Sequence, residues 1–493
     1  MTARDKPALA VGPVAVIAST VAIVLLLLSG WHGFHRDELY FIIAGRHPAL
    51  GYPDQPPLTP LLSAATTALF GVQPFAVRLL PALAIGATVA LVGGMARDMA
   101  GGRRAQIVAA ATAGLSGLLA AGHLGSTTTY ELLLSTLVLW LAVRLLDGAD
   151  HRLWLAVGVL GGVALQNKQT ALILGAGLAG GLALARRWDV LRSPMLWLGG
   201  LLALLIWAPN LLWQVTNGIP QLEMARSIAA EAGENRAMLI PELVLLAGPL
   251  LFPVSVAGVW WLARAPEAKP WRTIPAAFAV VLVLVLATGG KSYYASGYLG
   301  PLMAAGSIPV AAWLGRGRVR LRAAVVASAA LTSGLIIAVI ALPVIPPSAL
   351  AQTPLPEIYP EAAEQVGWPE LVETVEEATA SLSEEERAAA VVFTANYGEA
   401  AAIELLGGGS LPVYSGHNGY WDWGPPPEAA RHTVVVGIDV SSGWWRVLGA
   451  CTLVERVDNG LDLENQEQGA PVSVCRGRHA EWSEIWPQLR HLD

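Results

Sequence analysis

Apolar runs long enough to cross a lipid bilayer recur along this chain up to about residue 343, and they constrain its fold more than any other feature. They cover about residues 9–29, 79–95, 105–122, 131–146, 153–166, 170–185, 196–212, 239–262, 272–288, 296–314 and 321–343. Only 14% of the residues are charged and 54% are hydrophobic, whereas roughly a quarter of the residues in a soluble domain are charged. The sequence therefore predicts a mostly α-helical, polytopic membrane bundle with about eleven transmembrane helices.

Arginine and lysine gather at the N-terminus and in every second loop between the runs. They are Arg4 and Lys6; Arg97, Arg103 and Arg104; Arg144 and Arg152; Arg186, Arg187 and Arg192; Arg264, Lys269 and Arg272; and Arg316, Arg318, Arg320 and Arg322. Cytoplasmic loops carry an excess of basic residues, so these segments are predicted to be cytoplasmic. The first outer loop (30–78) and everything after residue 344 then lie outside. We expect a multi-pass protein of the plasma (inner, cytoplasmic) membrane, and its first run is predicted to be a retained signal anchor.

The composition changes after residue 343. Prolines punctuate 344–360, which predicts a semi-rigid linker. Beyond it, strand-like segments (390–394, 411–415, 432–439 and 451–457) alternate with helix-like ones (397–406 and 444–449). This alternation is typical of a small, largely parallel sheet. We therefore predict a transmembrane catalytic domain over 1–343, a linker over 344–360 and a small extracytoplasmic α/β domain over 361–493.

The stretch from Trp31 to Thr59, WHGFHRDELYFIIAGRHPALGYPDQPPLT, places acidic side chains directly after the first membrane helix. Asp37 and Glu38 are costly to desolvate against a bilayer, so function is the default hypothesis for the pair. A solvated cap after the helix is the alternative. A carboxylate here suits general-base catalysis on an acceptor hydroxyl. A lipid phosphate leaves as a stable anion, so one base and some cations would suffice.

Three further charged residues are predicted to lie on the outer side. Glu131 could orient an acceptor or help to hold a metal, and a helix-start glutamate near the positive end of the dipole is the alternative. Lys168 (in LQNKQTAL) and Lys291 (in GGKSYYASGY) are candidate cations for a phosphate, with snorkelling to the interface as the alternative.

The sequence indicates few other kinds of site. The nine histidines show no metal-binding spacing, so no protein metal site is predicted. No cofactor is certain, and a divalent cation stays open. Nothing resembles a nucleic-acid-binding stripe. Cys451 and Cys475 could form a disulfide outside the cytoplasm or stay buried thiols. The loop 415–427 (SGHNGYWDWGPPP) suits either sugar recognition or ordinary packing.

Several motifs together resemble one family. DELYFIIAGRHPALGYPDQPPLTPLL contains the pattern G-Y-x-D-x-P-P-L and resembles the first outer loop of the dolichyl-phosphate-mannose-protein mannosyltransferase-like family. This is the bacterial family 39 group of GT-C glycosyltransferases, which is related to the aminoarabinose transferases of lipid A. The same family is also resembled by four later segments: TYELLLSTLVLWLAVR, ALQNKQTAL, PNLLWQVTNGIPQLEM and GGKSYYASGYLGP. Two C-terminal segments resemble the outer domain of one bacterial subgroup: NYGEAAAIELLG and SGHNGYWDWGPPP.

The resemblance implies an inverting transferase. It would move a sugar, mannose or similar, from a polyprenyl-phosphate donor to a cell-envelope glycan, lipid or protein on the outer side of the membrane. By position, Asp37 matches the catalytic base and Glu38 its neighbour. Glu131 stands where the family usually has aspartate. The substrate-binding positions are Tyr52, Asp54, Lys168, Lys291, Tyr293 and Tyr294.

Two other functions stay as alternatives. A transporter or flippase for a lipid-linked glycan would place charged or helix-broken sites near the bilayer midplane. Here the polar residues gather at the outer face and no inverted repeat is evident. A non-catalytic assembly partner is the third hypothesis, which retention of the acid pair argues against.

Overall fold

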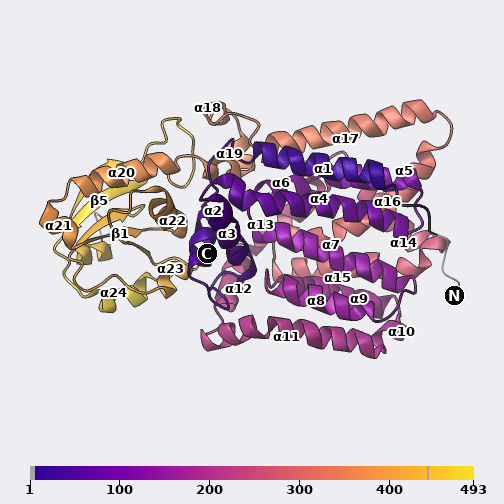
Figure 1. Ribbon diagram of the computed structural model, residues 1–493, viewed down its shortest axis with the longest axis horizontal. Helices are drawn as coiled ribbons and strands as arrows, with labels where there is room; N and C mark the ends of the chain where they lie inside the picture. Colours follow the sequence, from indigo (N-terminus) through magenta and orange to yellow (C-terminus); the bar gives the residue numbers. More distant parts are fainter. Residues whose placement is uncertain (1–5, 441–442, 493) are drawn as a thin grey trace. The chain divides into compact units, whose positions relative to one another are not determined.

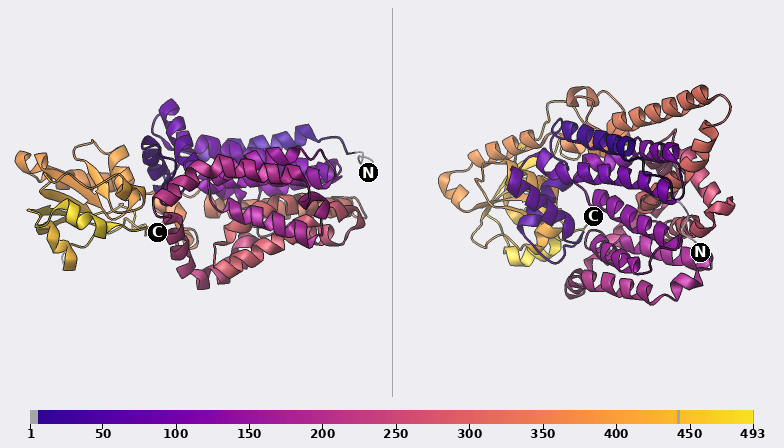
Figure 2. Two further views of the ribbon diagram at one scale, coloured as in Figure 1. Left: turned by 90° about the horizontal axis from the view of Figure 1, so that it is seen from below. Right: turned by 45° about the vertical axis from the view of Figure 1, so that its right-hand side comes forward.

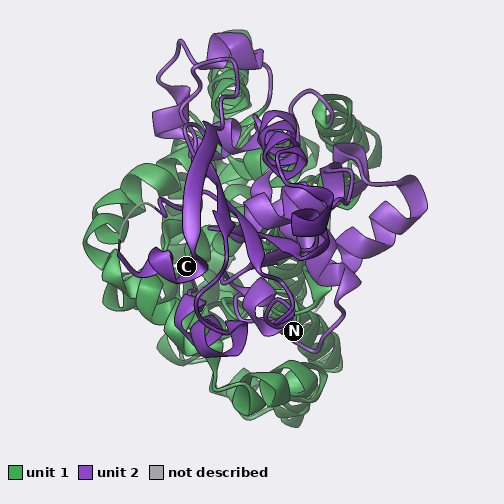
Figure 3. Ribbon diagram, turned by 90° about the vertical axis from the view of Figure 1, so that its left-hand side faces the viewer, with its two compact units in different colours: residues 1–29, 55–59, 78–342 green, residues 30–54, 60–77, 343–493 purple. Residues whose placement is uncertain are grey.

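The computed structural model describes residues 6–440 and 443–492, so Arg4 lies outside the described residues. Two compact units form within the chain, and neither is a continuous segment (Figure 3). Unit 1 comprises Met1–Ser29, Gln55–Thr59 and Arg78–Leu342, and unit 2 comprises Gly30–Asp54, Pro60–Val77 and Pro343–Asp493.

Unit 1 is a bundle of apolar helices that run alongside one another (Figures 1 and 2). Its helices are α1 (Val11–Leu28), α4 (Pro74–Asp98, from Arg78), α5 (Arg103–Gly114), α6 (Leu118–His123), α7 (Thr127–Leu146), α8 (Leu153–Leu165), α9 (Ala171–Leu184), α10 (Trp188–Leu191), α11 (Pro194–Thr216), α12 (Pro220–Ala230), α13 (Ala232–Ala247), α14 (Phe252–Arg264), η1 (Pro266–Trp271), α15 (Thr273–Thr288), η2 (Ser292–Tyr298), α16 (Leu299–Leu314) and α17 (Val319–Ala341).

The predicted membrane bundle is confirmed, but two of the predicted runs are broken. Among the described residues, six helices are long and apolar enough to cross a membrane, or seven if α13 and α14 form one bent span. The single helix predicted over 239–262 is wrong, because α13 and α14 meet at 98°. Gly248, between them, adopts a φ of 87° that glycine accepts without strain. The run 105–122 likewise divides into α5 and α6. A count of eleven spans stays a prediction.

Small residues bring the helices of unit 1 close together. A Cβ atom on Gly158 of α8 would collide with the backbone of Gly199 of α11. In a bilayer, lipid tails are as apolar as leucine, so helices associate by close packing of small side chains instead of by the hydrophobic effect. Replacing either glycine is therefore expected to separate α8 from α11.

Unit 2 contains a five-stranded sheet between two helical layers. Its elements are α2 (Arg36–Arg46), α3 (Leu58–Phe70, from Pro60), α18 (Pro347–Leu350), α19 (Leu355–Ile358), η3 (Pro360–Gln365), α20 (Trp368–Ala380), α21 (Glu384–Ala388), β1 (Ala390–Thr394), α22 (Tyr397–Leu406), β2 (Val413–Ser415), α23 (Gly419–Asp422), β3 (His432–Val436), η4 (Gly443–Leu448), β4 (Ala450–Arg456), β5 (Pro471–Arg476) and α24 (Trp482–Leu489).

The strand order is β2-β1-β3-β5-β4. The pairs β1–β2 and β1–β3 are parallel, while β3–β5 and β4–β5 are antiparallel. Strands β1, β2, β3 and β4 therefore run in one direction, as the sequence predicted, and β5, which was not predicted, runs in the opposite direction between β3 and β4. Cys451 and Cys475 face each other across β4 and β5 and form a disulfide, which answers the question that the sequence left open.

Both faces of the central strands β1, β3 and β5 are buried, which explains their continuous apolar sequences, whereas the edge strand β4 is largely exposed. Val392 and Val434 belong to one core with α20, α22 and α2, while Phe393 and Val435 belong to a second core with α24. Successive residues of a strand point to opposite faces. Helix α2 joins the first core with six consecutive buried residues, Leu39 to Ala44. Most of the first outer loop (Gly30–Asp54 and Pro60–Val77) is thus part of the same compact unit as the C-terminal segment.

Candidate active site

The N-terminus of α2 is fixed by its own side chains. The carboxylate of Glu38 accepts the backbone N–H of His35 at 2.9 Å, and the His35 ring accepts the backbone N–H of Asp37 at 3.2 Å. This reciprocal capping satisfies amides that a helix start leaves without partners. Glu38 is buried, so its carboxylate holds the first turn of the helix. A direct catalytic role for Glu38 stays a prediction.

Asp37 stands beside this cap with its carboxylate open to solvent on one side. The side chain is 37% exposed, and its Oδ1 accepts the hydroxyl of Tyr397 at 2.8 Å. Oδ2 lies 4.0 Å from the His35 ring nitrogen. One carboxylate oxygen is therefore oriented by a hydrogen bond, while the side chain as a whole stays accessible to a substrate.

Tyr397 reaches Asp37 because of the topology of the sheet. It is the first residue of α22, immediately after the carboxyl end of β1. Asn396 caps this helix by accepting the Glu399 N–H at 2.9 Å. Strand β1 lies between β2 and β3, where the connections turn in opposite directions. The carboxyl ends of parallel strands at such a point are the usual place for a site in an α/β sheet.

Asp54 forms a second tyrosine–carboxylate pair in unit 2. Its Oδ1 accepts the hydroxyl of Tyr40 at 2.9 Å, and the same hydroxyl oxygen accepts the Gly419 N–H at 3.1 Å. Burial, helped by the negative charge of Asp37, raises the pKa of Asp54 to about 7. Asp54 therefore changes charge near neutral pH.

Tyr52, the other predicted substrate-binding residue of this loop, is buried and already engaged. Its hydroxyl donates to the backbone carbonyls of Ala44 at 2.7 Å and His47 at 3.1 Å. These carbonyls belong to the last turn of α2, where helix acceptors lack partners. Tyr52 thus closes the C-terminal end of α2, and a contact with substrate stays a prediction.

Arg36 connects the start of α2 to further acids. Its guanidinium lies 5.7 Å from the Tyr397 ring centre, 4.0 Å from Asp37 Oδ1 and 3.9 Å from Glu364 Oε2. Burial raises the pKa of both Glu364 and Glu467. The positive charge of Arg36 therefore offsets part of the negative charge of the acids around Asp37.

The predicted residues of unit 1 form a second cluster. Lys168 Nζ lies 3.5 Å from Glu131 Oε2 and 4.5 Å from the centre of the Tyr293 ring, and it donates to the Thr128 hydroxyl at 3.1 Å. Glu131 Oε1 accepts the hydroxyl of Thr170 at 2.5 Å. Glu131 therefore lies beside the Lys168 ammonium group, and the catalytic role predicted for it stays a prediction.

Lys291 and Tyr294 are held by the glycines that end α15. Gly289 adopts a φ of 68°, and a Cβ on Gly290 would lie 2.9 Å from the Tyr294 ring. Tyr294 packs edge-to-face on Tyr293, with ring centres 4.9 Å apart. Within the described part of the chain, the ammonium of Lys291 has no ion pair. Its charge is thus available for an anionic group.

Metal binding has no support from these side chains. Over residues 6–440 and 443–492, no group of three or more His, Cys, Asp or Glu side chains is placed to hold a metal ion. The clusters instead offer carboxylates, tyrosine hydroxyls and lysines.

Three residues near the predicted base were missed by the sequence analysis: Arg36, Tyr40 and Tyr397. Arg36 and Tyr40 lie inside the quoted motif, so their position in RDELY was a signal that could have been used. Tyr397 is 360 residues from Asp37 along the chain, and only the folding of unit 2 brings them together.

Comparison with known proteins agrees with the motifs. The family model for dolichyl-phosphate-mannose-protein mannosyltransferase matches residues 54–213. The fold is similar to that of ArnT from Cupriavidus metallidurans bound to undecaprenyl phosphate, with a TM-score of 0.58 and 16% identity over 93% of this chain and 97% of that chain. A search of curated proteins gives no match.

A second structural relative is the archaeal oligosaccharyltransferase AglB from Archaeoglobus fulgidus in complex with an inhibitory peptide and a dolichol-phosphate. Its TM-score is 0.53 at 12% identity, over 86% of this chain and 69% of that chain. At these identities the structures establish the shared GT-C fold. Residues 54–213 are in addition similar to the dolichyl-phosphate-mannose-protein mannosyltransferase family, as the matched family model shows.

Proposed function

We propose that the protein transfers a single sugar from a polyprenyl-phosphate donor to an acceptor hydroxyl outside the cytoplasm, with Asp37 as the general base. The observation that carries the proposal is the Asp37 carboxylate, half-exposed at the start of α2 and oriented by the hydroxyl of Tyr397. A base must be accessible to the proton that it removes and must be held in position.

The chemistry is an inverting single displacement. The acceptor oxygen forms a bond to the anomeric carbon while its proton passes to Asp37. The bond between the anomeric carbon and the phosphate oxygen breaks, and the polyprenyl phosphate leaves with the electron pair as a stable anion. No general acid is needed for such a leaving group, so a single accessible carboxylate is sufficient.

We assign the donor phosphate to the lysines of unit 1. Lys168 is oriented by Glu131 and Thr128, and Lys291 has no competing ion pair among the described residues. Positive groups aimed at a leaving phosphate stabilise the charge that develops on it. Tyr293 and Tyr294 line the same cluster and are proposed to contact the donor.

The donor class is supported by the two structural relatives. ArnT from Cupriavidus metallidurans binds undecaprenyl phosphate, and AglB binds a dolichol-phosphate. Both are long polyprenyl chains that end in phosphate. Transfer of mannose or a similar sugar to a glycan, lipid or protein of the cell envelope is the corresponding proposal for this chain.

Location and domain division are part of the proposal. The distribution of basic residues supports a plasma-membrane protein with residues 361–493 outside the cytoplasm. The disulfide between Cys451 and Cys475 supports the same side, since disulfides persist in oxidising compartments. We assign residues 1–343 to the catalytic membrane domain and 344–360 to the linker.

The proposal is tested by incubating the purified protein with radiolabelled polyprenyl-phosphate mannose and membranes from its host. Wild type is expected to transfer label, and Asp37→Asn is expected to lose about 10²-fold or more of the rate. Asp462→Asn is the matched control, because Asp462 is exposed in the same unit and has a positive φ that asparagine accepts.

Each outcome separates the hypotheses. Transfer that survives in Asp37→Asn would remove the assigned mechanism but keep the enzyme. A protein that consumes no donor and moves lipid-linked glycan across proteoliposomes would instead be a flippase.

A further inference from the structure

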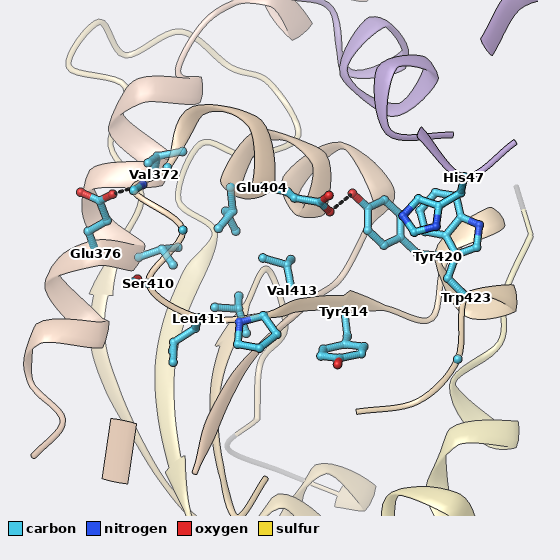
Figure 4. Close-up of a pocket in the computed structure, with 18 residues that line it drawn as sticks. His47, Val372, Glu376, Glu404, Ser410, Leu411, Val413, Tyr414, Tyr420 and Trp423 are labelled. Carbon is cyan, nitrogen blue, oxygen red and sulfur yellow. Dashed lines mark hydrogen bonds between the residues drawn. The ribbon is translucent and has the colours of Figure 1, made fainter. Parts of the chain in front are cut away.

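Unit 2 contains a cavity that the proposed chemistry does not use. It has a volume of about 320 Å³ and lies between α20, α22, β2 and α23, with His47 from the end of α2 at one side (Figure 4). Pockets of this size with aromatic walls and a few polar groups are typical of small-ligand sites.

Aromatic side chains form one wall of this cavity. Trp423 stacks on the His47 ring at 4.3 Å and meets Tyr420 edge-on at 4.6 Å, as their grouping in Figure 4 shows. Val413 of β2 points toward these rings, whereas the Tyr414 ring lies on the other face of the strand (Figure 4). Trp423 is only partly buried.

Acidic groups and a glycine-rich loop form the other walls. Glu404 accepts the hydroxyl of Tyr420 at 3.2 Å, and burial raises the pKa of this glutamate. Glu376 accepts the backbone N–H of Gly408 at 2.8 Å. The loop Gly407–Ser410 exposes backbone groups because three of its four residues lack a side chain. The cavity thus offers hydrogen-bond acceptors beside apolar rings.

We propose that this cavity binds a sugar unit of a neutral glycan, and that this glycan is the acceptor. A pyranose has an apolar C–H face that packs on aromatic rings and hydroxyls that donate to carboxylates. The lining contains two glutamates and neither lysine nor arginine. An anionic ligand such as a phosphate would meet repulsion there, whereas a neutral saccharide would not.

The position of the cavity along α2 supports an acceptor subsite. Asp37 lies in the first turn of α2 and His47 follows its last turn. Ten residues of helix correspond to about 15 Å. A glycan chain held near His47 would therefore have its reactive end several sugar units away, toward the proposed base. This inference names the acceptor class of the proposed transferase and rests on that function.

The test measures saccharide binding by full-length protein in detergent micelles, with no donor present. The probes are linear α-mannotetraose and triacetylchitotriose. Their binding is detected by saturation-transfer NMR, and the affinity is measured by titrating the saccharide into the protein. Ser410→Trp fills the mouth of the cavity, and Trp423→Ala removes one ring of its aromatic wall. Their matched controls are Thr452→Trp, an exposed position outside the cavity, and Trp423→Phe, which keeps an aromatic ring.

We expect at least one probe to bind wild type and both controls equally, and to bind Ser410→Trp and Trp423→Ala about tenfold more weakly. Apparent melting temperatures identify any variant that does not fold, and Ser410→Trp, in an exposed loop, remains informative if Trp423→Ala does not fold. Equal binding by wild type and Ser410→Trp would overturn the proposal, as would no binding of either probe.

The same variants separate this inference from the proposed function. Loss of sugar transfer in Asp37→Asn with unchanged probe binding supports both. Probe binding by a wild-type protein that transfers no sugar would keep the saccharide site and remove the transferase. Undiminished transfer to the host acceptor by Ser410→Trp would remove the acceptor subsite and keep the enzyme.

Discussion

Asp37 in unit 2 and Glu131 in unit 1 are both acids that the sequence placed on the outer side of the membrane, yet their surroundings differ. Asp37 is 37% exposed and accepts a neutral tyrosine hydroxyl, while the Glu131 side chain is 11% exposed and lies 3.5 Å from an ammonium group. Glu131 thus has one carboxylate oxygen beside Lys168 and the other bonded to Thr170, whereas the Asp37 carboxylate stays accessible to a substrate hydroxyl. Location on the outer side of the membrane is therefore not enough to identify a carboxylate as the general base.

Asp54 adds a third environment to this comparison. It accepts a tyrosine hydroxyl as Asp37 does, but burial raises its pKa to about 7. The three acids thus represent an exposed carboxylate, an ion-paired one and one that gains a proton near neutral pH. Substitutions that remove one partner at a time test whether these three environments give the acids different roles.

Among substitutions of the residues that surround these acids, the largest effect is expected for Lys168→Gln, which removes the ammonium group beside Glu131. If Lys168 stabilises the leaving phosphate, kcat/KM for the polyprenyl-phosphate donor falls about 100-fold. Lys269→Gln, at an exposed lysine outside the cluster, is the control. A loss below threefold in Lys168→Gln would mean that the phosphate is bound elsewhere.

Glu131→Gln is expected to have a smaller effect, because Glu131 acts through Lys168. Losing one partner of a charge pair leaves the lysine less well oriented, which should raise KM for the donor about tenfold with little change in kcat. Steady-state kinetics over a range of donor concentrations separates the two constants. A fall in kcat as large as that of Asp37→Asn would show that Glu131 takes part in the chemical step.

Tyr397→Phe removes the hydroxyl that orients Asp37 and keeps the aromatic ring. A hydrogen bond to a charged group contributes about 1.5 kcal/mol, so kcat is expected to fall about tenfold. Tyr414→Phe, which removes a tyrosine hydroxyl elsewhere in unit 2, should keep wild-type kcat. Equal rates for both variants would show that Tyr397 is not needed to position the base.

The sequence predicted local elements better than their assembly. Strand β1 and helix α22 have the predicted bounds, because a short apolar strand followed by a capped helix is encoded by adjacent residues. The break at Gly248 was missed, although Gly248-Pro249 was visible, because apolar composition alone does not report a bend within a long run.

The candidate site shows the same limit. Asp37, Glu131 and Lys168 were identified from motifs, and the structure pairs two of them. The hydrogen bond from Tyr397 to Asp37 depends on a contact between α2 and α22, which are separated by most of the chain. Strand β5 was also missed, since its pairing with β3 and β4 is set by tertiary contacts. Contacts between distant segments produce no hydrophobic periodicity in the sequence, so a pattern along the chain cannot predict them.

The smallest effect is expected for Asp54→Asn, and it concerns stability. The pKa of Asp54 rises from 3.8 to about 7 on folding. Its contribution to the free energy of unfolding is therefore fully present below about pH 4 and is lost as the pH rises through 7. Asparagine stays neutral and can still accept the Tyr40 hydroxyl, so the variant should escape this loss. We expect its apparent melting temperature to exceed that of wild type by about 2–4 °C at pH 8.5 and by less at pH 5, where only part of this loss has occurred.

Other buried acids of unit 2 also titrate, among them Glu399, whose pKa burial raises to about 7. The variant should therefore reduce the loss of stability with pH and not abolish it. Asp462→Asn, at an exposed aspartate, is the control and should follow wild type at both pH values. An equal gain for Asp54→Asn at pH 5 and pH 8.5 would show that the substitution acts through packing instead of charge. Asp54 would then differ from Asp37 in burial alone, and the distinction among the three acids would reduce to exposure and ion pairing.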